Sequence, residues 1–172
     1  GRLRRSKFDW FVGHVTPAFK TLVPKLCDAG IHVAMATASD KAEYRPYAPL
    51  GRTAPHTHML GEDLVVPLLH EAVPEHADRF CIVCYNPRAR GAEGARPENH
   101  GKEYHIREIC SHFDIPPASV LLLDDEERNH AAHLRERSLF TSIKVDARHG
   151  LQLPKLASQI KKMGPQVRIV EL

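Results

Sequence analysis

Two adjacent carboxylates, Asp124 and Asp125, follow directly after the apolar run at 120–123. Neighbouring carboxylates repel each other, but a divalent cation bound between them removes that repulsion. Mg²⁺ suits such a pair, because it typically takes one or two carboxylates together with water and a substrate phosphate. The same residues also fit the acidic first turn of a helix, which the helix dipole favours. On this segment alone, the two interpretations are equally well supported.

Three further polar residues could bind a phosphoryl group at the same place. Thr37 ends an apolar segment and offers a hydroxyl, Ser39 follows as a second donor, and Lys102 begins the segment that leads to Asp124. A cation and an ammonium screen the charge of a phosphate, while a hydroxyl donates to its oxygens. Taken singly, Thr37 is an ordinary strand-end residue and Lys102 an ordinary solvated lysine. Their order along the chain favours a phosphate site.

Alternating strands and helices must position these residues. Helical periodicity predicts helices at 16–30, 61–73, 102–113, 126–137 and 153–163. Short apolar segments predict strands at 31–38, 80–86, 119–123 and 140–146, and 166–172 can form a last strand. Thr16 is suited to cap the first helix, with Pro17 at its first position and Gly30 at its end, whereas Pro67 weakens the second. The alternation predicts an α/β fold whose parallel sheet is covered on both faces, with ligands beyond the carboxyl ends of the strands.

Length and composition are those of an ordinary globular protein. The chain has 172 residues, of which 42% are hydrophobic and 26% charged, so one domain is the simplest expectation, with a mobile loop at 87–101. The basic cluster at 2–7 lacks an accompanying aromatic pattern, and we interpret it as solvated rather than as a nucleic-acid footprint. No apolar run is long enough for a membrane span, and no apolar segment of a signal peptide follows the basic start, so a cytoplasmic location is expected.

The cysteines allow two interpretations. Cys81 and Cys84 form a C-x-x-C pair, and Cys110 with His112 could supply a second pair of zinc ligands. The segment around Cys81 reads as a strand, however, and the odd spacing puts the two thiols on opposite faces of it. We therefore favour buried free thiols over a zinc site.

The ordered set Thr37, Lys102 and Asp124-Asp125 resembles the second, third and fourth motifs of the haloacid dehalogenase (HAD) superfamily. More narrowly, the segment from Lys102 through "DIPPASVLLLDDEERN" looks like the eukaryotic magnesium-dependent phosphatases, as does "DARHGLQLPKL" at 146–156. The similarity covers roughly 14–160 and is strongest at 102–130. The resemblance implies a three-layer α/β/α sandwich with a mainly parallel, Rossmann-like HAD sheet and a small cap or none.

The resemblance also implies roles for the site residues. Thr37 would bind the transferring phosphoryl group, and Lys102 would hold the phosphate together with the nucleophilic carboxylate. Asp125, with Asp124, would hold Mg²⁺, and Asn129 would support the metal loop. The short intervals at 40–60 and 86–101 leave no room for a large cap, which predicts an open site for a phosphorylated small molecule or phosphoprotein. A nucleic-acid 3′-phosphatase is a weaker alternative that rests only on Arg88, Arg90 and Arg96.

The first motif of the superfamily, D-x-D-x-T, is not in this sequence. Its first aspartate is the nucleophile of these phosphatases, and the nearest N-terminal acid, Asp9, follows no apolar strand. We favour an upstream strand that carries the nucleophile, because the strands ending at Thr37 and Asp124 would otherwise lack a ladder partner. The segment 166–172 could fill that slot only with an unusual topology. The alternative is a catalytically inactive HAD-like binding or scaffold module.

Overall fold

The computed structural model describes residues 3–43, 57–89, 101–127, 129 and 140–162. Its helices are α1 (Phe8–Gly13), α2 (Pro17–Asp28), α4 (Glu62–Ala72), α5 (Glu103–Phe113) and α7 (Leu153–Lys162). Its strands are β1 (Leu3–Arg4), β2 (Val33–Thr37), β3 (His58–Met59), β4 (Phe80–Cys84), β5 (Leu121–Asp124) and β6 (Thr141–Lys144). Short 3-10 turns are η1 (Arg5–Lys7), η3 (Pro74–Arg79), η4 (Pro87–Ala89) and η6 (Pro117–Ser119). Most of the predicted helix at 126–137, most of the predicted loop at 87–101 and the whole predicted strand at 166–172 lie outside the described residues.

The first long helix, α2, is bounded by the signals that its sequence contains. The hydroxyl oxygen of Thr16 accepts a hydrogen bond from the backbone N–H of Phe19 at 3.3 Å, and Pro17 occupies the first turn. Beyond its end, Gly30 adopts the left-handed conformation with φ of 73°. The cap predicted at Thr16 and the stop predicted at Gly30 are therefore confirmed.

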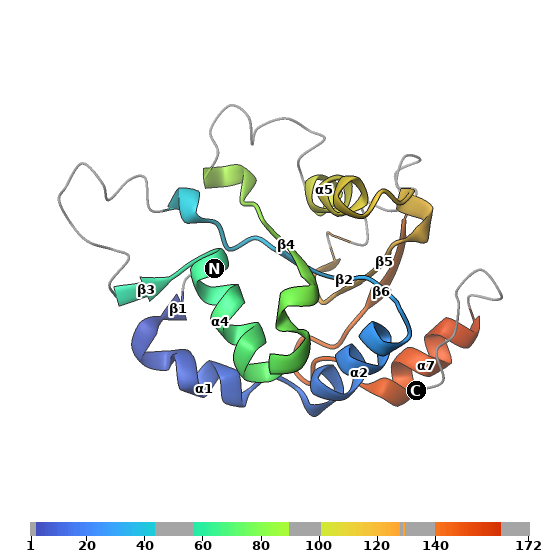
Figure 1. The fold of residues 1–172 in the computed structure, drawn as a ribbon, viewed down its shortest axis with the longest axis horizontal. Helices are drawn as coiled ribbons and strands as arrows, with labels where there is room; N and C mark the ends of the chain where they lie inside the picture. Colours follow the sequence, from blue (N-terminus) through green and yellow to red (C-terminus); the bar gives the residue numbers. More distant parts are fainter. Residues whose placement is uncertain (1–2, 44–56, 90–100, 128, 130–139, 163–172) are drawn as a thin grey trace.

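β2, β4, β5 and β6 form two parallel pairs. β2 pairs with β4, with Val33 opposite Phe80 and Thr37 opposite Cys84, and β5 pairs with β6, with Leu121 opposite Thr141. A short antiparallel pair joins β1 to β3. Helices alternate with these strands along the chain, so the predicted α/β class with parallel strands is confirmed (Figure 1).

Helices pack on both faces of the parallel pairs. On the β2–β4 pair, Cys81 and Val83 face Ile109 of α5, while the opposite face packs against α2 and α4 through Val23 and Leu69. The β5–β6 pair shares two of these helices. Ile106 and Cys110 of α5 contact Leu122 on one face, and Leu22 of α2 with Leu156 of α7 contacts Ile143 on the other. Both strand pairs therefore lie between α5 and α2 (Figure 1).

β2 and β5 each have one edge that no other strand joins within the described residues. The carbonyl of Thr37 accepts from the N–H of Tyr85 beside β4, so the backbone groups of Ala34 and Ala36 point the other way. Likewise, the carbonyl of Asp124 accepts from Val145 beside β6, so Leu121 and Leu123 present their backbone groups away from β6. We call the edge of β2 that faces away from β4, and the edge of β5 that faces away from β6, the inner edges.

Gly150 provides a test of packing between the chain after β6 and the start of α2. A Cβ at Gly150 would lie 2.7 Å from Cγ2 of Thr16, and φ is 63°. We expect Gly150→Ala to lower the free energy of unfolding by about 2 kcal/mol, because it adds a clash to left-handed strain. Gly30→Ala separates the two causes, since φ is 73° there but nothing lies within 4 Å, and about 1 kcal/mol is expected. Gly13→Ala introduces neither a clash nor left-handed strain. Urea denaturation of the three variants checks this order, and equal stabilities would contradict it.

No described helix combines the length and the apolar composition needed to cross a membrane.

Candidate functional site

Lys102 is buried at the start of α5, and its ammonium joins β2 to β5. Only 9% of the side chain is exposed. Nζ donates to the carbonyl oxygen of Ala36 at 2.6 Å and lies 3.6 Å from Oδ2 of Asp124. The Ala36 carbonyl belongs to the inner edge of β2, and Asp124 is the last residue of β5. Lys102 is thus a buried cation between two strand ends and not a solvated surface lysine.

The two aspartates that follow the apolar run have different surroundings. Asp124 is enclosed: its Oδ1 accepts from the backbone N–H of Glu126 and from Nδ2 of Asn129, both at 2.8 Å, and its Oδ2 faces Lys102. Asp125 is exposed at the surface. The asparagine predicted to support this loop therefore contacts the carboxylate itself, while Asp125 offers its carboxylate to a ligand from solvent.

The two hydroxyls after β2 accept hydrogen bonds from the chain around them. Oγ1 of Thr37 accepts from the N–H of Ser39 at 3.1 Å, which leaves the hydroxyl hydrogen of Thr37 to donate to another group. Oγ of the buried Ser39 accepts from the N–H of Gly61 at 2.9 Å. Ser39 therefore connects the loop after β2 to the start of α4.

Asp40 is a buried residue that the sequence interpretation did not single out. Only 2% of it is exposed, and its carboxylate accepts from the N–H of Ala42 at 2.8 Å and from the N–H of Asn86 at 3.0 Å. Asn86 also donates through Nδ2 to Glu43 at 3.0 Å. Asp40 thus ties the chain after β2 to the chain after β4. An aspartate just after a strand is a typical turn residue, and this is the only signal the sequence offered for it.

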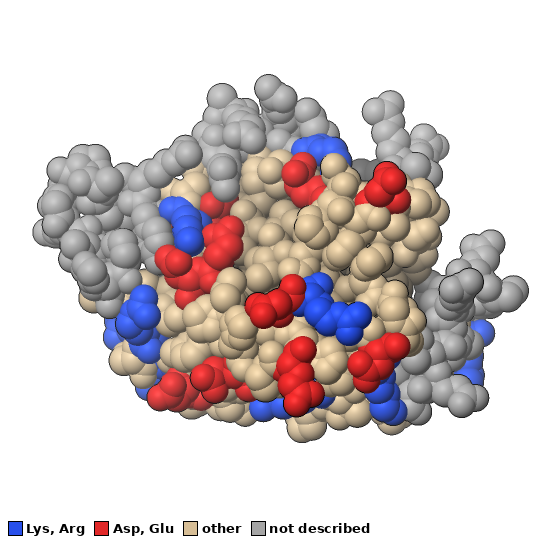
Figure 2. Space-filling view, viewed as in Figure 1, with Lys and Arg blue, Asp and Glu red and all other residues tan. Residues whose placement is uncertain are grey.

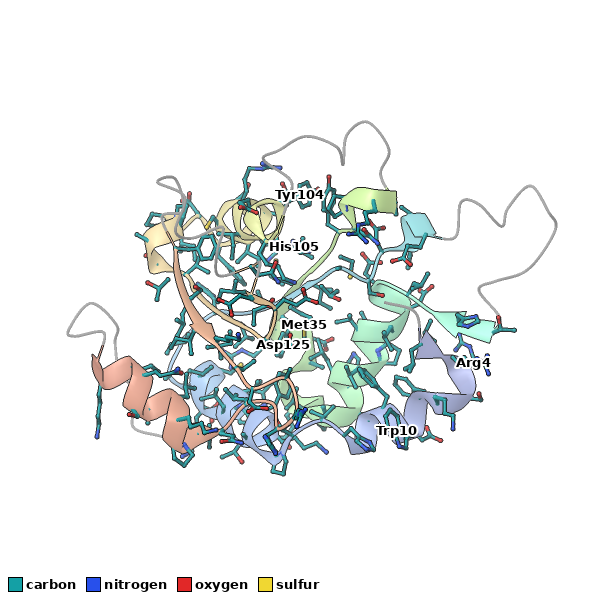
Figure 3. The ribbon with its side chains drawn as sticks, turned by 180° about the vertical axis from the view of Figure 1, so that it is seen from behind. Arg4, Trp10, Met35, Tyr104, His105 and Asp125 are labelled. Carbon is teal, nitrogen blue, oxygen red and sulfur yellow. The ribbon has the colours of Figure 1, made fainter. Side chains whose placement is uncertain are left out.

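His105 is the second residue that the sequence interpretation missed. It is 1% exposed, and its Nε2 lies 3.0 Å from the carbonyl oxygen of Thr37. The ring also meets Tyr85 and Tyr104 edge to face, and Figure 3 shows Tyr104 and His105 together on α5. Burial, reinforced by the nearby ammonium of Lys102, lowers the pKa of His105 to about 4. In the sequence, the signal for His105 was its position three residues after Lys102 and next to the apolar Ile106.

Of the two carboxylates at this site, Asp125 is exposed and Asp124 is enclosed by its hydrogen-bond partners. No group of three or more His, Cys, Asp and Glu residues that could hold a metal occurs in the part of the chain that the structure describes. A Mg²⁺ site of the predicted kind needs only one or two protein carboxylates, with water and phosphate as the other ligands. Asp125 is accessible for this role, and Asp124 is oriented by Asn129 beside it.

The C-x-x-C pair does not bring two thiols together. Cys81 packs with Val83 against α5, whereas Cys84 packs in the cluster on the opposite face with α2 and α4, as the odd spacing predicts. Burial raises the pKa of Cys84 to about 12, so its thiol is protonated at neutral pH. Cys81 is therefore a buried thiol and Cys84 a half-buried one, packed on opposite faces of β4.

Charges of both signs are interspersed on the face shown in Figure 2. Of the three arginines behind the nucleic-acid alternative, Arg88 is exposed, while Arg90 and Arg96 lie outside the described residues. Near the end of β6, Lys144 pairs with Glu127 in an exposed salt bridge. The charge distribution on this face does not add support to a nucleic-acid substrate.

Comparisons of the chain with protein-family models, with curated proteins and with solved structures found no match. The functional argument therefore depends on the residues and contacts described above.

Proposed function

We propose that this chain carries the phosphate- and Mg²⁺-binding half of a HAD-type phosphatase, which hydrolyses a phosphomonoester through an aspartyl-phosphate. One observation carries the proposal: the buried ammonium of Lys102 contacts both the end of β2, next to Thr37, and the carboxylate of Asp124 at the end of β5. These residues are far apart in the sequence, yet the fold brings them together at strand ends, where α/β proteins bind ligands.

In the proposed reaction each residue acts on the phosphoryl group or on its neighbour. Lys102 compensates the negative charge that the phosphoryl oxygens carry in the transition state, and the hydroxyl of Thr37 donates to one of them. Asp125, with Asp124, would hold Mg²⁺, which neutralises further charge. Asn129 keeps Asp124 in place through its 2.8 Å hydrogen bond. The phosphorylated substrate is a small molecule or a phosphoprotein.

In this proposal the nucleophilic carboxylate would come from a D-x-D-x-T strand, a motif that these 172 residues do not contain. The inner edges of β2 and β5 support this, because the backbone groups of Ala34, Leu121 and Leu123 and the N–H of Ala36 face a side where a further strand could pair with them, while the Ala36 carbonyl already accepts from Lys102. Such a parallel strand would bring its carboxyl end close to Lys102. With it, the fold would be the three-layer α/β/α sandwich with a Rossmann-like sheet, and a small cap or none, that the resemblance implies.

The proposal predicts Mg²⁺-dependent turnover of a generic phosphomonoester by the natural full-length protein. Steady-state assays with p-nitrophenyl phosphate, with and without Mg²⁺, measure it. Asp125→Asn is expected to lower kcat/KM by at least about 10²-fold, because it removes an accessible metal carboxylate. Asp9→Asn is the matched control, since Asp9 is exposed on α1, and it should retain the activity. Turnover without Mg²⁺, or turnover that Asp125→Asn leaves unchanged, contradicts the proposal.

The second candidate function is an inactive HAD-like binding or scaffold module. The observation that favours it is the lack of D-x-D-x-T in these residues. A protein of this kind binds inorganic phosphate with Mg²⁺ but hydrolyses no phosphomonoester. A D-x-D-x-T motif in the reading frame immediately before Gly1 would count against it.

A further inference from the structure

His105 and Lys102 reach the end of β2 from the same turn of α5. They are three residues apart, a spacing that puts two side chains on one face of a helix. Lys102 Nζ donates to the carbonyl of Ala36, and His105 contacts the carbonyl of Thr37, the next residue along. The first turn of α5 is therefore attached to the last two residues of β2 through two side chains.

The hydrogen bond to Thr37 determines where the imidazole carries its proton. A carbonyl oxygen can only accept, so the 3.0 Å contact requires a proton on Nε2 of His105. Nδ1 is buried and has no hydrogen-bond partner among the described residues. Burial lowers the pKa of His105 to about 4, so the ring is neutral at pH 7 and donates through Nε2–H alone.

Besides its pairing with Cys84 in the β2–β4 ladder, Thr37 accepts three hydrogen bonds from other described residues. Its carbonyl accepts from the N–H of Tyr85 and from Nε2–H of His105, both at 3.0 Å, and its hydroxyl oxygen accepts from the N–H of Ser39 at 3.1 Å. Only the bond from Tyr85 comes from the chain that continues the neighbouring strand β4. The bond from His105 is the one that connects Thr37 to the helix that carries Lys102.

We propose that His105 is a positioning residue, whose Nε2–H locks the start of α5 onto the end of β2 and thereby sets the Thr37 hydroxyl and the Lys102 ammonium for one phosphoryl group. The part of this inference that concerns phosphate rests on the proposed function. The part that concerns Thr37 and Lys102 is a property of the fold and is tested separately.

Two substitutions separate hydrogen bonding from filling of space. His105→Leu retains a buried side chain but loses the donor, whereas His105→Gln retains an N–H donor on a side chain of similar reach. Cys110→Ala is the matched control for stability, because Cys110 is buried on the same helix and packs against Leu122, away from the end of β2. A role in packing alone affects all three variants, while a positioning role distinguishes leucine from glutamine.

The first experiment is ¹⁵N NMR of the natural full-length protein without any ligand. In the wild type we expect a protonated Nε2 of His105 between pH 5 and 8 and a slowly exchanging ammonium signal from the buried Lys102. His105→Leu should abolish the ammonium signal and shift the amide signal of Ser39, while His105→Gln and Cys110→Ala retain both. Signals in His105→Leu that match those of the wild type, or a proton on Nδ1, would overturn the proposal.

The second experiment is calorimetric titration of folded variants with inorganic phosphate in the presence of Mg²⁺. His105→Leu is expected to weaken phosphate binding by at least about tenfold, the effect of weakening one hydrogen bond to a charged group. His105→Gln should recover most of this loss. Equal weakening in both variants would overturn the positioning role. A wild type that binds no phosphate while the NMR results hold would instead contradict the proposed function, which keeps the two failures distinct.

Discussion

Replacement of Lys102 by methionine is expected to lower the free energy of unfolding by about 3 kcal/mol and to abolish phosphate binding. Methionine retains the length of the side chain but removes its charge. Asp124, whose side chain is 11% exposed, then loses its cationic partner, and the carbonyl of Ala36 loses its 2.6 Å donor. A buried carboxylate and a buried carbonyl without partners are both costly, so the loss reflects the groups left behind more than the value of the pair.

Urea denaturation at pH 7 and calorimetry with inorganic phosphate and Mg²⁺ measure the two effects. Lys144→Met is the matched control, because Lys144 also pairs with an acid, Glu127, but their side chains are 55% and 74% exposed. Exposed pairs contribute little, so a loss of at most about 1 kcal/mol is expected there. The prediction fails if the two lysine substitutions lower the free energy of unfolding equally, since burial of the ion pair would then have no effect on stability.

Protonation of His105 alone is expected to lower the free energy of unfolding by about 3 kcal/mol as the pH falls from 6.5 to about 4. The unfolded chain binds a proton at this residue with a pKa near 6.5, whereas the folded state does so only near pH 4, because burial disfavours the charged ring. Between these values the unfolded state binds more protons, so the free energy of unfolding falls as the pH falls. Above pH 6.5 the contribution is fully present, and below pH 4 it is lost.

The groups that face His105 set the size of this effect. Lys102 opposes protonation of the ring, whereas the carboxylates of Asp124 and Asp40 and the carbonyl of Thr37 favour it. His105→Gln removes the titration, so its stability should be flat over the same pH interval. The pKa of Asp146 is lowered to about 2 by hydrogen bonds from His149 and Arg148, so its contribution is lost only below pH 3.8 and does not overlap. Identical pH dependence in the wild type and the glutamine variant would rule out His105 as the cause.

Local signals in the sequence determined most of the elements. The apolar runs at 31–38 and 119–123 became β2 and β5, and the amphipathic segment at 102–113 became α5. The helix predicted at 61–73 formed as α4 with Pro67 inside it. The buried face of α4 includes Leu64, Val65 and Leu69. Burial of this apolar face stabilises the helix by more than the loss of the backbone hydrogen bond at Pro67 destabilises it. The pairing of β1 with β3 was not predicted, because two-residue strands leave no periodic pattern.

The sequence also determined which residue types could handle a phosphate: Thr37, Lys102 and the pair Asp124-Asp125. Only the tertiary structure decided how deeply each of these side chains is buried and what it contacts. It buried Lys102 between two strand ends, enclosed Asp124 and left Asp125 exposed, and these differences arise from contacts between segments distant in the chain.

Ser39 and His105 show the same division most directly. The sequence predicted a phosphate donor at Ser39 and assigned no role to His105. In the fold, Oγ of Ser39 accepts from the N–H of Gly61, and Nε2 of His105 lies 3.0 Å from the carbonyl oxygen of Thr37. A hydroxyl or an imidazole can donate or accept almost anywhere, so its role depends on which backbone group the fold brings within about 3 Å. Residue types therefore set which interactions a side chain can make, and the packing of α5 against β2 decides which of them form in the fold.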